Sequence, residues 1–307
     1  MADGNFTVVG LGELLWDLFP AGKQLGGAPA NFAYISSLLG DHGVVASRIG
    51  RDPLGEEAKR RFQHFRLPTD FLQLDSTRPT GTVKVLVDVA GQPQYEITDN
   101  VSWDFLEMTS AWRALAAQAS AISFGSLAQR SVVSRGTILD FLAAARPEAV
   151  RIFDVNLRQS FYSQEILVDS ARRANIIKLN QEELPKVMDL LGAPKSSALR
   201  GDTKTEAQWL FETTGAQLIC ITRGGAGSLL VSPDSSHEHG GFPVRVRDTV
   251  GAGDAFAAAL VHHFLRGAPL SAMNEAANRM GAWVASCAGA MPDPDPAILE
   301  KVRNAHR

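Results

Sequence analysis

Short apolar runs alternate with helix-like segments along most of the chain, and this alternation restricts the possible fold more than any other feature. Residues 6–10 and 44–49 read as buried strands, whereas 54–65 has the spacing of an amphipathic helix. Parallel strands need a crossover between them, so the pattern predicts an α/β fold with a mainly parallel sheet. Further strands are predicted at 121–124, 151–154, 176–179, 218–222, 227–231 and 244–247. Further helices are predicted at 132–145, 166–174, 182–191, 203–214, 255–266 and 270–287, with another that Gly40 closes.

One stretch departs from this alternation. Residues 82–89 place valine at every second position, residues 90–93 form a turn, and 94–97 run back. This pattern predicts an antiparallel hairpin with one solvated face. We expect a small sheet that stands off the main body and covers a site.

Composition excludes several classes of protein. The 307 residues carry a net charge of −3 without a basic block, which disfavours nucleic acid and acidic membranes as partners. We expect no signal peptide and no membrane-spanning run. Cys220 and Cys287 lie outside any metal-binding or redox spacing, so we predict buried free thiols and a cytoplasmic protein.

Residues 247–256 hold the most suggestive local chemistry. Gly251-Ala252-Gly253-Asp254 comes just before an apolar run of helical length. Glycines at a helix start expose N–H groups where the helix dipole favours an anion. Asp254 fits beside an anion if it accepts a proton from a hydroxyl that attacks a phosphoryl group. The plainer alternative is that Asp254 caps the helix and the glycines form a loop.

Polar residues follow several predicted strands, at the edge where open α/β sheets bind ligands. These residues are Glu13, Asp154, Asn156, Asn180 and Arg223.

Motifs narrow the kind of phosphate chemistry. The Walker-type loop, the dinucleotide-binding Gly-x-Gly-x-x-Gly, the Gly-x-Ser-x-Gly elbow and His-Glu-x-x-His are all absent. Two signatures remain, Gly-Gly-Ala-Pro-Ala-Asn at 26–31 and Asp-Thr-Val-Gly-Ala-Gly-Asp-Ala-Phe at 248–256. Together they resemble the ribokinase-like (pfkB) carbohydrate kinase family, and the likeness runs from about residue 6 to about residue 298. Residues 12–17, 26–34 and 153–158 most resemble bacterial fructokinases.

The resemblance implies a three-layer α/β/α ribokinase-like fold with a mainly parallel central sheet and a small β lid. Residues 1–12, 26–78 and 100–307 would form the large nucleotide-binding and catalytic domain, and 13–25 with 79–99 the lid. It also implies ATP-dependent phosphorylation of a sugar hydroxyl with Mg2+, and D-fructose is the favoured substrate. The alternatives are another sugar such as 2-keto-3-deoxygluconate or ribose, a nucleoside kinase, or a non-catalytic sugar-binding homologue. Ala28 stands where ribose kinases often have lysine, which argues against ribose. A homodimer through the lid is common in the family.

The resemblance also assigns residues. Asp254 would be the general base, with an anion hole formed by the amides of Gly251, Ala252 and Gly253. Sugar contacts would come from Asp17, Gly26, Gly27, Asn31 and Arg158. ATP contacts would come from Asn180, Thr222, Arg223, Gly224, Gly227 and Asn278. Glu183 would hold Mg2+ through water, and Asp248 with Val250 would belong to a loop for a monovalent cation such as K+.

Taken alone, several of these residues have plainer interpretations. Asn31 fits a polar residue in a first helical turn, Arg158 a surface arginine, and Asn278 a helix surface. Glu183 fits a helix start favoured by the dipole. The His237-x-His239 pair is predicted to lie in a solvated loop.

Overall fold

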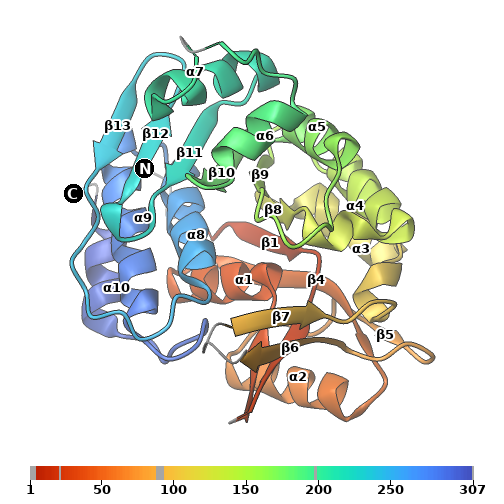
Figure 1. The fold of residues 1–307 in the computed structure, drawn as a ribbon. Helices are drawn as coiled ribbons and strands as arrows, with labels where there is room; N and C mark the ends of the chain where they lie inside the picture. Colours follow the sequence, from red (N-terminus) through yellow and green to blue (C-terminus); the bar gives the residue numbers. More distant parts are fainter. Residues whose placement is uncertain (1–4, 21, 88–92, 197–198, 306–307) are drawn as a thin grey trace.

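The computed structural model describes residues 5–20, 22–87, 93–196 and 199–305, and these fold around one large sheet with helices on both faces (Figure 1). Within the described residues, its strand order is β13-β12-β11-β10-β9-β8-β1-β4-β5. Pairing is parallel from β11 to β5, and only β12 and β13 at one edge run antiparallel. The strands are β1 Thr7–Leu11, β4 His42–Gly50, β5 Leu72–Asp75, β8 Ala121–Gly125, β9 Val150–Asp154, β10 Ile176–Asn180, β11 Leu218–Thr222, β12 Ser228–Val231 and β13 Ser236–His239. The predicted mainly parallel α/β fold is therefore confirmed.

Apolar faces of the helices build two cores, one on each side of the sheet. Phe32, Phe62 and Leu260 belong to one core, whereas Phe141 and Leu210 belong to the other. The first face carries α1 Ala28–Leu38, α2 Pro53–His64, α8 Ala252–Phe264, α9 Leu270–Ala285 and α10 Pro296–Arg303. The second carries α3 Ser110–Gln118, α4 Val132–Ala144, α5 Gln164–Arg173, α6 Leu184–Leu190 and α7 Thr203–Thr214. None of the described helices is both long and apolar enough to cross a membrane.

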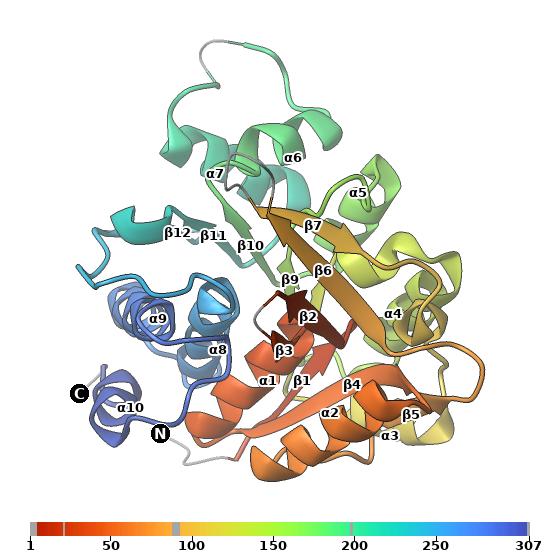
Figure 2. The ribbon, with the colours of Figure 1, turned by 60° about the horizontal axis from the view of Figure 1, so that its bottom comes forward.

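A second, smaller sheet stands apart from the large one (Figure 2). Its order is β3-β2-β6-β7, with β2 Leu15–Phe19, β3 Gly22–Gly26, β6 Gly81–Val87 and β7 Pro93–Ile97. The predicted hairpin is confirmed, because β6 and β7 pair antiparallel from Val83 opposite Ile97 to Val87 opposite Pro93. Positions 88–92, which include most of the predicted turn, lie outside the described residues.

The prediction of a strand at 244–247 was wrong. Residues 240–250 hold no regular element, and Val244 and Val246 are exposed. The backbone is tied to α9 instead, because Arg247 and Asp248 both donate their N–H to the Ala285 carbonyl, at 2.9 and 3.2 Å.

The loop predicted around His237 and His239 was also wrong, since this segment is strand β13. An edge strand with polar residues on both faces lacks the apolar alternation that identifies strands. Its register comes from tertiary contacts: it pairs with β12, and His239 lies 3.0 Å from Glu275 of α9. Cys220 is buried as predicted, but Cys287 is only partly buried.

Candidate active site

The glycine loop opens helix α8, as its sequence predicts. Gly251 is the N-cap residue in the left-handed region, with φ 78°, and a Cβ there would lie 2.3 Å from the Cβ of Ala290. Only glycine fits both constraints. The helix begins at Ala252, so the amides of residues 251–253 lie at its positive end, where helix geometry supplies no acceptors. Ala252 N–H makes one long contact, 3.3 Å to the Thr249 carbonyl.

Asp254 does not cap this helix. It lies in the first turn, where Gly251 is the N-cap and no side chain provides a cap hydrogen bond. The carboxylate is bonded to another helix: Asn31 Nδ2 donates to Asp254 Oδ2 at 2.7 Å, across 223 positions of sequence. The structure therefore joins residues of both sequence signatures in one contact.

The environment of Asp254 favours a proton acceptor. Burial raises the pKa of Asp254 from 3.8 to about 6, and the neighbouring Asp154 charge adds to this. The Asn31 hydrogen bond and the charges of Lys178 and Arg158 act in the opposite direction. A carboxylate with this pKa is ionised at neutral pH and is a stronger base than an ordinary aspartate.

Asp17 lies in β2 of the small sheet, beside the glycine pair. A Cβ at Gly26 would be 2.6 Å from Asp17 Oδ2, and one at Gly27, with φ 108°, would be 2.5 Å from the Glu13 carbonyl. Glycine is required at position 27, where backbone passes so closely and φ is positive, whereas a side chain at position 26 would displace the Asp17 carboxylate. Burial raises the pKa of Asp17 to about 6, whereas the charge of Arg158 lowers it.

Arg158 is exposed and lies in the loop after β9. Its charge acts on Asp17, Glu13 and Asp254, which places the guanidinium within electrostatic reach of three carboxyl groups. The structure therefore brings Arg158 toward the same region as the predicted base and the predicted sugar-binding aspartate.

Two buried groups near Asp254 were not assigned a role from the sequence. Glu13 is 4% exposed, and its Oε2 has no partner among the described residues. Burial raises its pKa to about 7, with a further contribution from the Asp254 charge. Lys178 in β10 is also buried and donates to both Asp154 oxygens, at 2.9 and 2.7 Å. A lysine within the apolar run Ile-Ile-Lys-Leu was the signal that could have identified it.

Asn180 and Glu183 form reciprocal side-chain to backbone hydrogen bonds at the start of α6. Asn180 Oδ1 accepts from the Glu183 amide at 2.8 Å, and Glu183 Oε2 accepts from the Asn180 amide at 2.8 Å. Glu183 Oε1 accepts from Leu157 N at 2.7 Å, and burial raises the pKa of this carboxyl. Each Glu183 oxygen still has a lone pair for water. A magnesium ion that keeps its water shell therefore fits here through water.

The Thr222-Arg223-Gly224 turn lies next to Asn180. Thr222 and Asn180 are register partners at the ends of β11 and β10. Gly224 has φ 56°, and a Cβ at Gly227 would lie 1.9 Å from the His239 carbonyl. The turn thus requires glycine, and the structure places it at the same sheet edge as Asn180.

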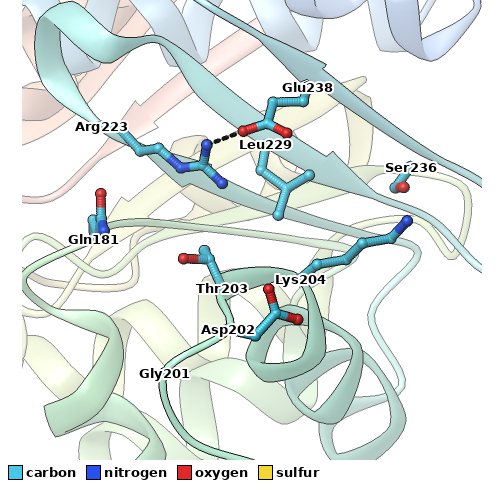
Figure 3. Close-up of a pocket in the computed structure, with 9 residues that line it drawn as sticks. All are labelled: Gln181, Gly201, Asp202, Thr203, Lys204, Arg223, Leu229, Ser236 and Glu238. Carbon is cyan, nitrogen blue, oxygen red and sulfur yellow. Dashed lines mark hydrogen bonds and ion pairs between the residues drawn. The ribbon is translucent and has the colours of Figure 1, made fainter.

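Arg223 forms an ion pair with Glu238 and lines a cavity of about 610 Å³ (Figure 3). The other lining residues are Gln181, Gly201, Asp202, Thr203, Lys204, Leu229, Ser236 and Glu238. The cavity touches the predicted ATP turn but none of Asp254, Asn31 or Asp17, so it is not the site of the proposed base.

Asn278 lies within a buried polar network. Its Nδ2 donates to Ser228 Oγ at 2.7 Å and to the Asn274 carbonyl at 2.8 Å. This nitrogen thus fastens α9 to β12. The predicted adenine contact remains a prediction.

Asp248 connects two loops. Its Oδ1 accepts from Val250 N at 3.0 Å and its Oδ2 from Gly289 N at 3.1 Å. Across the described part of the chain, no cluster of three or more His, Cys, Asp or Glu side chains could hold a metal ion. The predicted role of Asp248 and Val250 in a cation loop remains a prediction.

Comparison with known proteins matches residues 17–297 to the family model of the pfkB family carbohydrate kinases. An uncharacterized sugar kinase from Pyrococcus horikoshii is 28% identical over 97% of this chain and 96% of its own length. Its crystal structure in complex with ATP has a TM-score of 0.81 and 26% identity, and covers 97% of this chain and 99% of that one.

Two of the similar proteins differ in the substrate for which they are named. A fructokinase from Salmonella typhimurium is 30% identical over 84% of each chain. A 5-dehydro-2-deoxygluconokinase from Bacillus cereus is 27% identical over 88% of this chain and 83% of its own length.

Proposed function

The chain belongs to the pfkB family of carbohydrate kinases, and from that premise we propose that it transfers the γ-phosphoryl group of ATP to a hydroxyl of D-fructose, giving fructose 6-phosphate. The observation that carries this proposal is the 2.7 Å bond between Asn31 and Asp254 at the start of α8. This bond joins a carboxylate of raised pKa, in the first turn of α8, to the Asn31 side chain, which we assign to the sugar.

In the proposed reaction the sugar hydroxyl oxygen attacks the γ-phosphorus as the bond from that phosphorus to the β–γ bridging oxygen breaks. ADP leaves with the bridging oxygen, and the hydroxyl proton passes to Asp254. The amides of Gly251, Ala252 and Gly253 stabilise the charge on the transferring group. Asp17, Gly26, Gly27 and Asn31 orient the sugar. Magnesium, when bound with ATP, neutralises phosphate charge, and we assign its water contact to Glu183.

We assign the ATP phosphates to Asn180, Thr222, Arg223, Gly224 and Gly227, and the adenine side to Asn278. Asp248 and Val250 are our candidates for a K+ loop. The division into a large domain (1–12, 26–78, 100–307) and a lid (13–25, 79–99) also belongs to this proposal. So do a cytoplasmic location and a homodimer through the lid.

One observation favours an acidic sugar as the second candidate. Arg158 is exposed, and its charge acts on the carboxyls of buried Glu13 and of half-buried Asp17 and Asp254. An arginine beside a sugar site can also bind a substrate carboxylate. The Bacillus cereus relative named for a deoxygluconate substrate agrees with this alternative.

The test is a substrate panel with coupled ADP detection. It compares D-fructose, 2-keto-3-deoxygluconate, 5-dehydro-2-deoxygluconate, ribose and adenosine at equal concentration, with Asp254→Asn as the control for contaminating kinases. The highest kcat/KM on fructose supports the proposal. Faster turnover of a keto-acid selects the second candidate, and no turnover of any sugar contradicts kinase function.

A further inference from the structure

Lys178 and Asp154 form a buried ion pair beneath the glycine loop. They are register partners on the neighbouring strands β10 and β9, so their side chains project from the same face of the sheet. Lys178 Nζ donates to both carboxylate oxygens, at 2.9 and 2.7 Å, and both side chains are less than a tenth exposed. A protein with apolar residues at these two positions would commonly be as stable, because the attraction within a buried ion pair often does not offset the cost of desolvating both charges. The pair therefore calls for a role besides stability.

The ammonium also faces helix α8. A Cβ at Gly253 would lie 3.3 Å from Lys178 Nζ and 4.0 Å from its Cε. Gly253 is in the first helical turn, so Nζ lies against the positive end of the helix dipole. Two positive features side by side repel each other unless an anion is shared between them. Asp154 provides that anion, and Lys178 Nζ places a fixed positive charge next to the first-turn amides of α8.

Five side chains act on Asp254 from the surrounding elements. Asn31 donates from α1, and Asp154 and Lys178 act from β9 and β10. Arg158 acts from the loop after β9, and Glu13 from the segment after β1. Within the ion pair the two effects are opposed: the Asp154 charge raises the pKa of Asp254, and the Lys178 charge lowers it.

Lys178 keeps its proton under these conditions. Burial alone would lower its pKa, but the charge and hydrogen bond of Asp154 outweigh burial and hold the pKa above its ordinary value. The side chain is thus a fixed positive charge and not a proton carrier.

We propose that Lys178 is a positioning residue for phosphoryl transfer: held by Asp154, its ammonium lies against the start of α8 and adds fixed positive charge beside the Gly251–Gly253 amides and Asp254. The inference rests on the proposed function, because it assumes that Asp254 accepts the sugar proton. It adds a residue outside both sequence signatures to the site.

The experiment compares Lys178→Gln, Lys178→Arg and Asp154→Asn by the pH dependence of kcat/KM. Removal of the ammonium should shift the acid limb of the kcat/KM profile, where activity rises as Asp254 ionises, to higher pH by about one unit. Removal of the Asp154 charge should shift it to lower pH. We expect Lys178→Gln to lower kcat by ~10-fold or more, as loss of one fixed stabilising charge implies. Lys178→Arg keeps the positive charge, so its acid limb should lie at the wild-type pH.

A merely structural pair predicts a different result. Both charge-removing variants would then lose activity and thermal stability together, with the acid limb unmoved or moved in the same direction. That result would overturn the proposal.

A second variant covers the case in which the single substitutions do not fold. Lys178→Met combined with Asp154→Leu replaces the pair by apolar side chains of similar volume, which buried ion pairs commonly tolerate. With Tm maintained, we expect kcat to remain reduced ~10-fold. Wild-type kcat in this double variant would contradict the proposal.

Failure of the proposed function gives a separate signal. If the wild-type protein phosphorylates no sugar in the panel, the assignment of Asp254 as the general base is refuted. The charge coupling can then still be measured by 13C-carboxyl titration of Asp254, assigned by comparison with Asp254→Asn. Opposite shifts in Lys178→Gln and Asp154→Asn support the coupling, and equal titration in all forms refutes it.

Discussion

Asp254 combines three properties that its neighbours create. It lies half-buried in the first turn of a helix, near the helix-start amides, it accepts a hydrogen bond from Asn31, and its pKa is raised to about 6. The local sequence is compatible with either a helix-capping or a general-base role for Asp254. The contacts with a neighbouring helix and with neighbouring strands favour the general-base role.

The first prediction concerns this carboxylate. Asp254→Asn keeps an oxygen that can accept the Asn31 bond but removes the base, so kcat should fall by ~10²-fold or more. Sugar and ATP affinities, measured by calorimetry, should change little. For the wild-type protein, kcat/KM should rise with pH through about 6, since the base works only when ionised. A variant with normal kcat would remove Asp254 from the base role.

Glu13 gives a prediction about stability. Its pKa is about 7 in the folded protein and 4.5 in the reference state, so the native state binds this proton more tightly. The contribution of this proton to the free energy of unfolding is fully present below pH 4.5 and is lost as the pH rises through 7. Glu13→Gln removes the ionisable group. The variant should gain about 2 to 3 kcal/mol relative to wild type between pH 5 and pH 8.

Urea denaturation at the two pH values measures this gain. Glu182→Gln, at an exposed position, is the matched control: it keeps Glu13 and should show the wild-type pH dependence, without the gain. A Glu13→Gln variant with the same pH dependence as wild type would show that Glu13 is not buried in its ionised form.

Asp52 links two elements, helix α2 and the start of strand β6. It caps α2 by accepting from Gly55 N at 2.8 Å, and it accepts from Thr80 N and Thr80 Oγ1 at 2.7 and 2.8 Å. Although burial opposes it, these hydrogen bonds hold the pKa of Asp52 below its ordinary value. One carboxylate thus joins the large sheet's helix layer to the small sheet.

Asp52→Ala should therefore destabilise the protein by about 1 to 2 kcal/mol for the lost helix cap, and by about 1 kcal/mol more for the lost Thr80 hydrogen bonds. Thermal and urea unfolding measure the loss. Asp202→Ala is the control, because Asp202 is exposed and caps α7 by accepting from Thr205 N and Thr205 Oγ1 in that helix's first turn. Equal destabilisation by the two substitutions would argue against the link from α2 to β6.

At the scale of the whole molecule, both sheets contribute residues to the candidate active site. The small sheet supplies Asp17, the large sheet supplies Asp154 and Lys178, and the helices supply Asn31 and Asp254. A sugar that contacts Asp17, Asn31 and Asp254 would connect the small sheet to the helices of the large sheet and exclude water from the transferring phosphoryl group.

We therefore predict that ATP hydrolysis without sugar is slow, below a hundredth of the rate with a good sugar substrate, as exclusion of water implies. Coupled ADP detection with and without sugar measures the ratio. Equal rates would contradict a role of the small sheet in excluding water. Asp254→Asn, assayed in parallel, identifies any background ATPase.

The sequence by itself determined the α/β class, the hairpin and the glycine loop. Periodicity and glycine placement are local properties, and they are encoded in adjacent residues such as those at 82–87 and 251–254. It did not reveal strand β13, whose polar residues become a strand only because β12 supplies hydrogen-bonding partners.

Only the tertiary structure decided the electrostatics of the site. The pKa values of Asp254 and Glu13, the Asn31 contact and the Lys178–Asp154 pair all depend on residues far apart in the chain. Charge interactions act through space, and burial depends on the packing of whole elements. The sequence can therefore supply the candidate groups, but their chemistry is set by which groups the fold places beside them.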